Sequence, residues 1–156
     1  MTSARLWVYK CSVDSLVAGN WDAFFPKGKL PRRKSAKRWG GTQTTADHGS
    51  LQILREDMQP GDLVLAWQVD LKAMSGICEV AKLRRVGGRD PHRPKIELFL
   101  LPLRRFSPVV RRGNLPNVRA LTAGSRGTLH RTTLAEAKRL LRACGANDYL
   151  GRLEAD

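Results

Sequence analysis

The sequence predicts an α+β fold, in which a mixed or antiparallel β-sheet is flanked by short helices. Three strand-like runs, residues 63–69, 74–83 and 96–103, follow one another without a helical segment between them. Parallel neighbours would need such crossover segments, so successive antiparallel pairing is favoured. With 156 residues, the chain is expected to form one domain over residues 1–156.

The first part of the chain is predicted to hold one strand, two short helices and a basic loop. Residues 6–10 are aromatic and β-branched, which is typical of a strand. Ser12 or Asp14 is expected to cap a helix near residues 16–18. Prolines and glycines then predict an exposed loop at about 22–38, whose base is held by Trp21, Phe24 and Phe25. A helical pattern over residues 50–58 ends in a turn at 59–62.

The sheet and the C-terminal helix follow from the rest of the chain. Gly76 indicates a bulge or a close backbone approach, and Pro102 indicates the end of a strand at an edge or bulge. One or two helical turns over 115–121 and a short strand over 128–131 come next. Thr133-Leu134-Ala135-Glu136 matches a capping box, and Gly145 ends the helix that it begins. The tail, 147–156, is expected to hold one more short helix.

The charge balance is the first indication of function. The chain has 28 Lys and Arg against 14 Asp and Glu, a formal net charge of +14. Such an excess attracts polyanions, and nucleic acid is the partner that it favours over a protein that is merely basic. The cations expected to contact phosphates lie in the basic loop and in a later cluster: Arg32, Arg33, Lys34, Lys37, Arg38, Arg104, Arg105, Arg111, Arg112 and Arg126.

Other functional classes find little support. The three cysteines are far apart and form no metal-ligand motif, so we expect no cofactor, no metal and a reducing, cytoplasmic compartment. No apolar run is long enough for a membrane span or a leader peptide. The sequence has no GxSxG, HExxH or phosphate-binding glycine loop, so no enzyme is predicted. A pair such as His48 with Asp70 in the folded chain remains the enzymatic alternative.

Four tryptophans occur in the first half of the chain among cations. Bases stack on aromatic side chains, and a base turned out of its strand needs stacking walls and polar groups at its edge. Trp7 and Trp21 are expected in the core, and Trp67 suits the core or a pocket equally. Trp39 lies between two cations and two glycines, in a segment that is predicted to be a loop, which favours stacking on a base.

Short motifs along almost the whole chain resemble those of the EVE domain, a relative of the YTH domain in the PUA-like superfamily. The motifs are Trp7-Val8-Tyr9-Lys10-Cys11-Ser12, Arg38-Trp39-Gly40-Gly41, residues 58–67 around Gly61-Asp62, Ser75-Gly76-Ile77-Cys78-Glu79-Val80, and residues 126–133. Cys11 stands where the family usually has serine.

The resemblance implies a twisted β-barrel flanked by helices, with a pocket that takes a modified, methylated base out of DNA or RNA. Trp39 matches the tryptophan that stacks on methylated adenine in YTH relatives, with Gly40 beside it. Trp67 would form a second wall, and Lys10, Cys11 and Ser12 would lie at the pocket mouth. The implied partners are the modified nucleic acid and a separate nuclease or other effector protein.

Three other functions fit the same residues. The first is a PUA-type RNA-binding module without specificity for a modification. The second is a small nucleoside- or nucleotide-processing enzyme that uses the same cavity. The third is a basic subunit of a ribonucleoprotein assembly.

Overall fold

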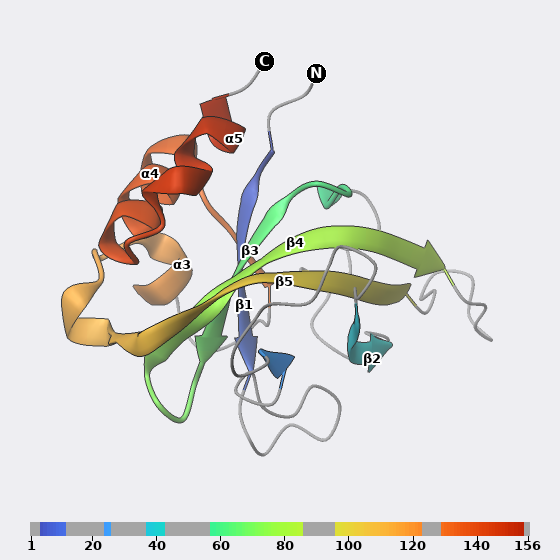
Figure 1. Cartoon of the computed structure of the whole chain (residues 1–156), viewed down its shortest axis with the longest axis horizontal. Helices are drawn as coiled ribbons and strands as arrows, with labels where there is room; N and C mark the ends of the chain where they lie inside the picture. Colours follow the sequence, from blue (N-terminus) through green and yellow to red (C-terminus); the bar gives the residue numbers. More distant parts are fainter. Residues whose placement is uncertain are drawn as a thin grey trace.

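A computed structural model of the chain describes residues 4–11, 24–25, 37–42, 57–85, 96–122 and 129–154 (Figure 1). For residues 37–42 it describes the course of the backbone. The predicted helices near 16–18 and 50–58 and most of the predicted basic loop lie outside these residues. The strands are β1 (Leu6–Cys11), β2 (Lys37–Thr42), β3 (Leu63–Gln68), β4 (Ala73–Arg85), β5 (Ile96–Arg111) and β6 (Leu129–Arg131).

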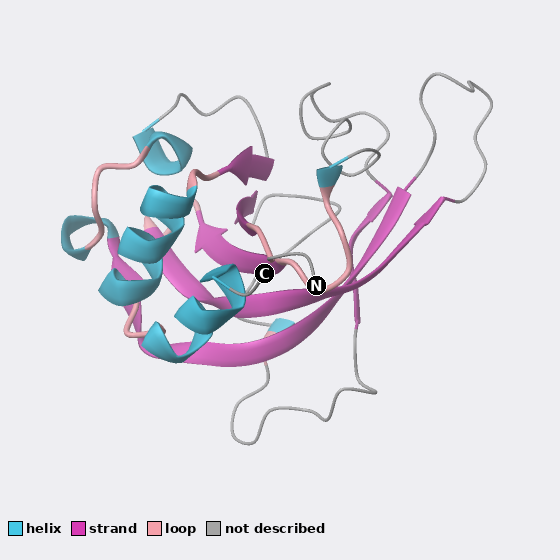
Figure 2. Ribbon diagram, turned by 90° about the horizontal axis from the view of Figure 1, so that it is seen from above, coloured by secondary structure: helices cyan, strands magenta, loops and turns pink. Residues whose placement is uncertain are grey.

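The six strands form one mixed sheet in the order β2-β5-β4-β3-β1-β6. β1 pairs in parallel with β3, and the other pairs are antiparallel, so the predicted mixed pairing is confirmed. The expected barrel is wrong for the part of the chain that the structure describes, because no pairing there joins β2 to β6. The sheet is open and strongly twisted (Figure 2). β6 has three residues and β2 pairs only with the first part of β5, so neither edge offers a long ladder for closure.

Alternating side chains give the sheet two buried faces. On β1, Trp7 and Tyr9 join one hydrophobic cluster, and Leu6 and Val8 join another. The second cluster also contains the buried residues of the C-terminal helices, so we call its side of the sheet the helix face. This face is covered by α3 (Arg119–Thr122), α4 (Leu134–Ala143) and α5 (Leu150–Glu154), with the short 3₁₀ turns η3 (Arg112–Asn114) and η4 (Asn147–Tyr149).

β5 is twice as long as predicted. The expected end at residue 103 is wrong, because the strand continues to Arg111 through Pro102 and Pro108. Pro102 lies opposite Cys78 of β4, at a register shift. β2 pairs with β5 only as far as Leu100, so at Pro102 no described strand pairs with the other edge of β5. Because a proline at a bulge on an unpaired edge removes no hydrogen bond between strands, β5 can continue beyond Pro102.

The C-terminal helices form as their signals predict. Thr133 caps α4: its hydroxyl accepts from the Glu136 amide, and the Glu136 carboxylate accepts from the Thr133 amide. This backbone hydrogen bond from Thr133, and another from Arg119, lower the pKa of Glu136. Gly145 has φ +67° just after the helix, as expected of a helix-ending glycine. The predicted short helix of the tail is α5.

The two ends of the described chain lie side by side. The Ala4 amide donates to the Arg152 carbonyl at 3.2 Å, and both ends emerge at the same side of the molecule (Figure 1). This side is opposite the turn between β3 and β4.

Phe24 and Phe25 are buried, as predicted for the base of the basic loop, and Trp21 lies outside the described residues. Both rings are buried in the cluster on the face opposite the helices, and they meet edge to face with centroids 5.4 Å apart. Phe25 packs directly on Gly76 of β4. A Cβ atom added there would lie 2.5 Å from the Phe25 ring and 2.6 Å from the Arg104 carbonyl oxygen. The predicted close approach is confirmed, together with a register shift between Met74 and Gly76.

We predict that Gly76→Ala lowers the free energy of unfolding by roughly 1–3 kcal/mol, because the new methyl group overlaps an immobile ring and a backbone oxygen. Urea titration followed by tryptophan fluorescence measures the change. Gly113→Ala is the matched control, since an added Cβ there meets nothing within 4 Å. Equal stability of the two variants would show that Phe25 moves freely away from the strand.

Candidate nucleic-acid interface

A buried carboxylate organises the end of the sheet where β1 begins. Asp62 is 4% exposed and accepts three hydrogen bonds, from the Trp7 indole N–H at 2.9 Å, the Gln59 amide at 3.0 Å and the Arg5 amide at 3.1 Å. The Asp62 backbone also accepts from the Val80 amide at 2.7 Å. This residue therefore joins β1, the turn before β3, and β4. Sequence reasoning placed Asp62 in a turn but could not find its distant partners, Trp7 and Arg5, which lie 55 and 57 residues earlier.

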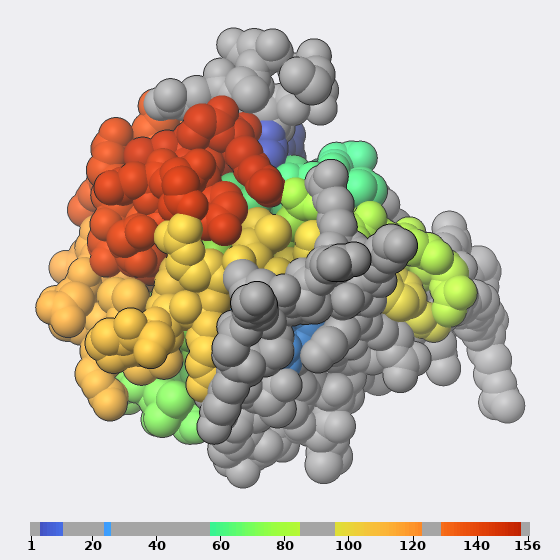
Figure 3. Space-filling view, viewed as in Figure 1, coloured from blue at the N-terminus to red at the C-terminus, as the bar shows by residue number. Residues whose placement is uncertain are grey.

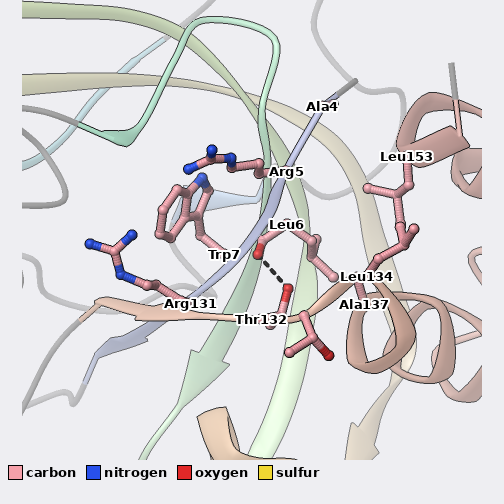
Figure 4. A pocket seen from close by; sticks show the side chains of 10 residues that line it. Ala4, Arg5, Leu6, Trp7, Arg131, Thr132, Leu134, Ala137 and Leu153 are labelled. Carbon is pink, nitrogen blue, oxygen red and sulfur yellow. Dashed lines mark hydrogen bonds between the residues drawn. The ribbon is translucent and has the colours of Figure 1, made fainter. Parts of the chain in front are cut away.

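A hollow of about 540 Å³ lies beside this carboxylate, between the start of β1, the segment from β6 to α4, and α5 (Figure 4). Its lining residues are Ala4, Arg5, Leu6, Trp7, Arg131, Thr132, Thr133, Leu134, Ala137 and Leu153. Thr132 closes one wall by donating its hydroxyl hydrogen to the Leu6 carbonyl at 2.7 Å. Sequence reasoning missed this hollow because its two walls are more than 120 residues apart.

The two arginines of the hollow flank Trp7 in Figure 4 and extend away from Leu134 and Leu153. Arg131 stacks over the Trp7 ring at 5.7 Å and forms an ion pair with Asp57. Trp7 itself is 1% exposed, so its ring is a core element, as predicted, and offers no stacking surface. The hollow is thus a shallow amphipathic surface at the opposite end of β1 from the predicted pocket mouth.

The predicted mouth lies where β1 and β3 end together. The parallel register sets Lys10 beside Trp67 and Cys11 beside Gln68. Lys10 is partly buried, and this burial lowers the pKa of its ammonium group. Trp67 is 7% exposed and belongs to the cluster on the helix face. The structure therefore brings Lys10 and Trp67 together, with Trp67 mainly a core residue, while Ser12 lies outside the described residues.

Trp39 lies in β2, an edge strand, where the sequence predicted a loop. It pairs with Leu98 of β5, and a register shift separates Trp39 from Thr42. β5 and β4 stand between β2 and β3, so Trp39 and Trp67 are not on neighbouring strands. Leu98 belongs to the cluster on the face opposite that of Trp67. Two tryptophans facing each other across one cavity remain a prediction, as does the role of Gly40.

The second cluster of arginines is divided by the structure. Arg104 forms an ion pair with Asp148, donates to the Gly145 carbonyl at 3.2 Å and lies 5.3 Å from the Tyr149 ring centroid, which fixes η4 to β5. Arg105 points to the other face and donates to the Phe25 carbonyl at 2.9 Å.

At the far end of β5, Arg112 donates to the Asn117 side chain at 2.9 Å, and Arg111 is exposed. The four arginines therefore form no single patch. Arg111 is the one best placed to meet a phosphate, since Arg104, Arg105 and Arg112 all hold protein groups. Arg32, Arg33, Lys34 and Arg126 lie outside the described residues, and Lys37 and Arg38 are in β2.

Two of the three thiols, those of Cys78 and Cys144, are buried. Cys78 is fully buried, and burial raises the pKa of Cys144 to about 12, so both are held as thiols. Within residues 4–11, 24–25, 37–42, 57–85, 96–122 and 129–154, no group of His, Cys, Asp and Glu could hold a metal ion. In those same ranges no helix has the length and apolar character that crossing a membrane requires.

No protein-family model matches the sequence, and no curated protein matches it. Solved structures match over almost the whole chain. The human THYN1 protein in complex with DNA containing 5-methylcytosine is 14% identical, with a TM-score of 0.64 over 90% of this chain and 98% of that one. Protein Atu2648 from Agrobacterium tumefaciens is 17% identical, with a TM-score of 0.65 over 93% and 96%. The DUF55 domain of human thymocyte nuclear protein 1 is 13% identical, with a TM-score of 0.59 over 97% and 99%.

These likenesses confirm at the level of the fold what the motifs predict. The chain has the PUA-like fold of the DUF55, or EVE, proteins. Identities of this size establish the architecture and leave the ligand to be argued from the residues of this chain.

We predict that Asp62→Ala lowers the free energy of unfolding by about 3 kcal/mol, because the buried Trp7 indole and two part-buried amides lose their acceptor together. Thermal and urea unfolding measure the loss. Asp148→Ala is the control, since the exposed ion pair with Arg104 contributes less than about 1 kcal/mol. A loss no larger than that of the control would mean that the Asp62 contacts contribute little to stability.

Proposed function

We propose that this protein is a non-catalytic reader of a modified base in DNA or RNA. The base is turned out of its strand and stacks on Trp39, and Lys10, Cys11 and Ser12 contact its edge. Gly40 allows the base to approach the backbone beside Trp39, and Trp67 supports the pocket beneath Lys10. A methylated base is the expected ligand, because its methyl group adds apolar area that is buried against the aromatic ring and so strengthens binding.

The observation that carries this proposal is the large positive net charge of this chain. Its fold is shared by a protein that was solved in complex with DNA. Each Asp and Glu whose side chain the structure describes already has a hydrogen bond or ion pair within the protein, including Asp57, Asp62, Glu79, Glu97 and Asp148. The formal net charge of +14, which already counts every carboxylate, is the excess that attracts a polyanion.

The fold likeness supports the modified base in particular. The human THYN1 protein that shares the fold was solved with DNA containing 5-methylcytosine. In this chain, the junction of β1 and β3 sets a partly buried lysine next to a tryptophan at an end of the sheet. A lysine with lowered pKa donates hydrogen bonds without the full hydration of an exposed ammonium group, which suits contact with the edge of a base.

We predict that Trp39→Ala weakens binding to an oligonucleotide with a modified base about 10- to 100-fold, the loss expected for one stacked base. Binding to the unmodified oligonucleotide should fall much less. Fluorescence anisotropy with paired DNA and RNA probes, with and without 5-methylcytosine or N6-methyladenine, measures both. Trp39→Phe, which keeps a stacking ring, is the matched control and should retain most of the preference.

Equal losses for the modified and plain probes would leave Trp39 a general packing or stacking residue. A wild-type protein that binds plain RNA as tightly as any modified probe would be a PUA-type RNA-binding module without modification specificity.

Two arginines of β5, Arg111 and Arg104, differ in their expected roles: Arg111 contacts phosphate, and Arg104 supports the fold. Arg111→Gln should reduce the slope of log affinity against log salt for duplex DNA by about 0.9, the value for one phosphate contact. Arg104→Gln is the matched control from the same strand, because its guanidinium already holds Asp148 and Gly145. An unchanged slope for Arg111→Gln would remove the end of β5 from the interface.

A further inference from the structure

The turn between β3 and β4 carries two exposed aliphatic side chains. It consists of residues 69–72, and Val69 is 44% exposed and Leu71 45% exposed. Among the residues that the structure describes, the only other large hydrophobic side chain exposed to this degree is Leu134, on α4. Sequence reasoning read Val69 as the end of a buried strand and Leu71 as part of a connection, and so missed this apolar tip.

The turn breaks two local rules at once. Turns between strands are normally built from Gly, Asn, Asp and Pro, whereas this one presents Val and Leu to solvent. Lys72 adopts φ +48°, a left-handed conformation in which a glycine would be unstrained. Conformations of this kind cost about 1–3 kcal/mol and cluster at functional sites. The strained lysine and the apolar residues together indicate a binding role for the turn.

The neighbouring strands hold the tip rigid. The Lys72 amide donates to the Val69 carbonyl at 3.2 Å, and the Arg112 amide donates to the Lys72 carbonyl at 2.9 Å. The buried Gln68 side chain donates to the Asp70 carboxylate at 2.5 Å, which draws this negative charge toward the sheet. Val69 and Leu71 therefore project from a turn whose backbone is hydrogen-bonded within itself and to Arg112.

Cations surround the tip, and the predicted pocket mouth lies next to it. Lys72 and Arg111 are exposed, and Ala73 at the start of β4 pairs with Arg111. Gln68, the residue just before the turn, pairs with Cys11 at the end of β1. In Figure 1 the loop between β3 and β4 lies at the end toward which β1 and β3 point, and in Figure 3 this green segment is seen at the lower left of the molecule.

We propose that the tip formed by Val69 and Leu71 is a wedge that enters duplex nucleic acid beside the base to be read. Lys72 and Arg111 hold the flanking phosphates. This inference rests on the proposed function, because it concerns how that function reaches a base inside a duplex.

The chemistry favours a duplex over other partners. Turning a base out of a duplex removes its stacking and pairing, and proteins offset this by inserting Leu, Ile, Met, Phe or Pro side chains between base steps. Two aliphatic residues two positions apart suit a single base step. They offer little area to a membrane, and the flanking cations match phosphates on both sides of the gap.

The test uses the full chain with Val69→Ser and Leu71→Ser combined. Leu134→Ser is the matched control, because it removes from α4 a leucine that is 53% exposed, more than Leu71. Three DNA probes are compared by anisotropy: a fully paired duplex with one central 5-methylcytosine, the same duplex with that base mispaired, and the modified strand alone. A 2-aminopurine next to the modified position reports unstacking.

The double variant should bind the paired duplex at least about tenfold more weakly, while its affinity for the single strand changes less than twofold. For the mispaired duplex, in which unstacking is easier, the double variant should show an intermediate loss of affinity. The 2-aminopurine fluorescence of its complex with the paired duplex should be lower than that of the wild-type complex. Leu134→Ser should match the wild type on all three probes. Equal losses on duplex and single strand, or no loss on either, would overturn the wedge.

Failure of the proposed function gives a different pattern. If the wild type binds modified and plain strands equally, the proposal that it reads a modified base fails. The wedge can then still be tested on plain probes, by comparing the ratio of duplex to single-strand affinity between the double variant and the wild type. If the wild type binds no probe, both ideas fail. Binding to anionic lipid vesicles that the double variant loses would assign the tip to a membrane surface and overturn the wedge.

Discussion

The Asp62 carboxylate is the contact on which the remaining architecture depends. It lies where the chain enters β3 and draws together groups that are distant in sequence: the Trp7 indole, the Arg5 amide and the Gln59 amide. Because a buried carboxylate must have its acceptors satisfied, these donors specify one register between β1 and β3. That register then sets Lys10 beside Trp67 and Cys11 beside Gln68 at the far end of the strands. The geometry of the proposed mouth is thus determined by a carboxylate at the opposite end of the same strands.

Local signals in the sequence predicted the local structure well. The capping box at Thr133, the glycine after α4 and the bulge at Gly76 each depend on the residue itself and a few neighbours. The length of β5, the strand at Trp39 and the division of the arginines depend on contacts with distant segments, which one sequence does not reveal. Arg104 is the clearest example: in sequence it is one cation of a basic cluster, but in the fold it anchors η4 through Asp148. The motifs that resemble the EVE domain carried this long-range information, and they predicted the fold.

The arginines illustrate how one residue type serves both fold and function here. Several of them bridge the sheet to the C-terminal helices or to distant turns, through Asp57, Glu79 and Asp148. Lysines and arginines outnumber aspartates and glutamates by 14, so these pairs leave a large excess of positive charge on the chain. The long-range field comes from this excess, because each internal ion pair is neutral at a distance. Increasing salt is expected to screen the exposed cations more strongly than a partly buried pair such as Arg152 with Glu79.

The adjacency of Ala4 and Arg152 has a practical consequence for engineering. Both ends of the described chain leave the molecule at one place, on the side away from the turn between β3 and β4. A nuclease, deaminase or fluorescent protein tethered to either end would hang from the same point and leave the opposite side clear. Inserting the domain into a loop of a larger protein would also need only a short gap between the two junctions. The fold is therefore suited to carry a cargo at one place, held apart from the turn between β3 and β4.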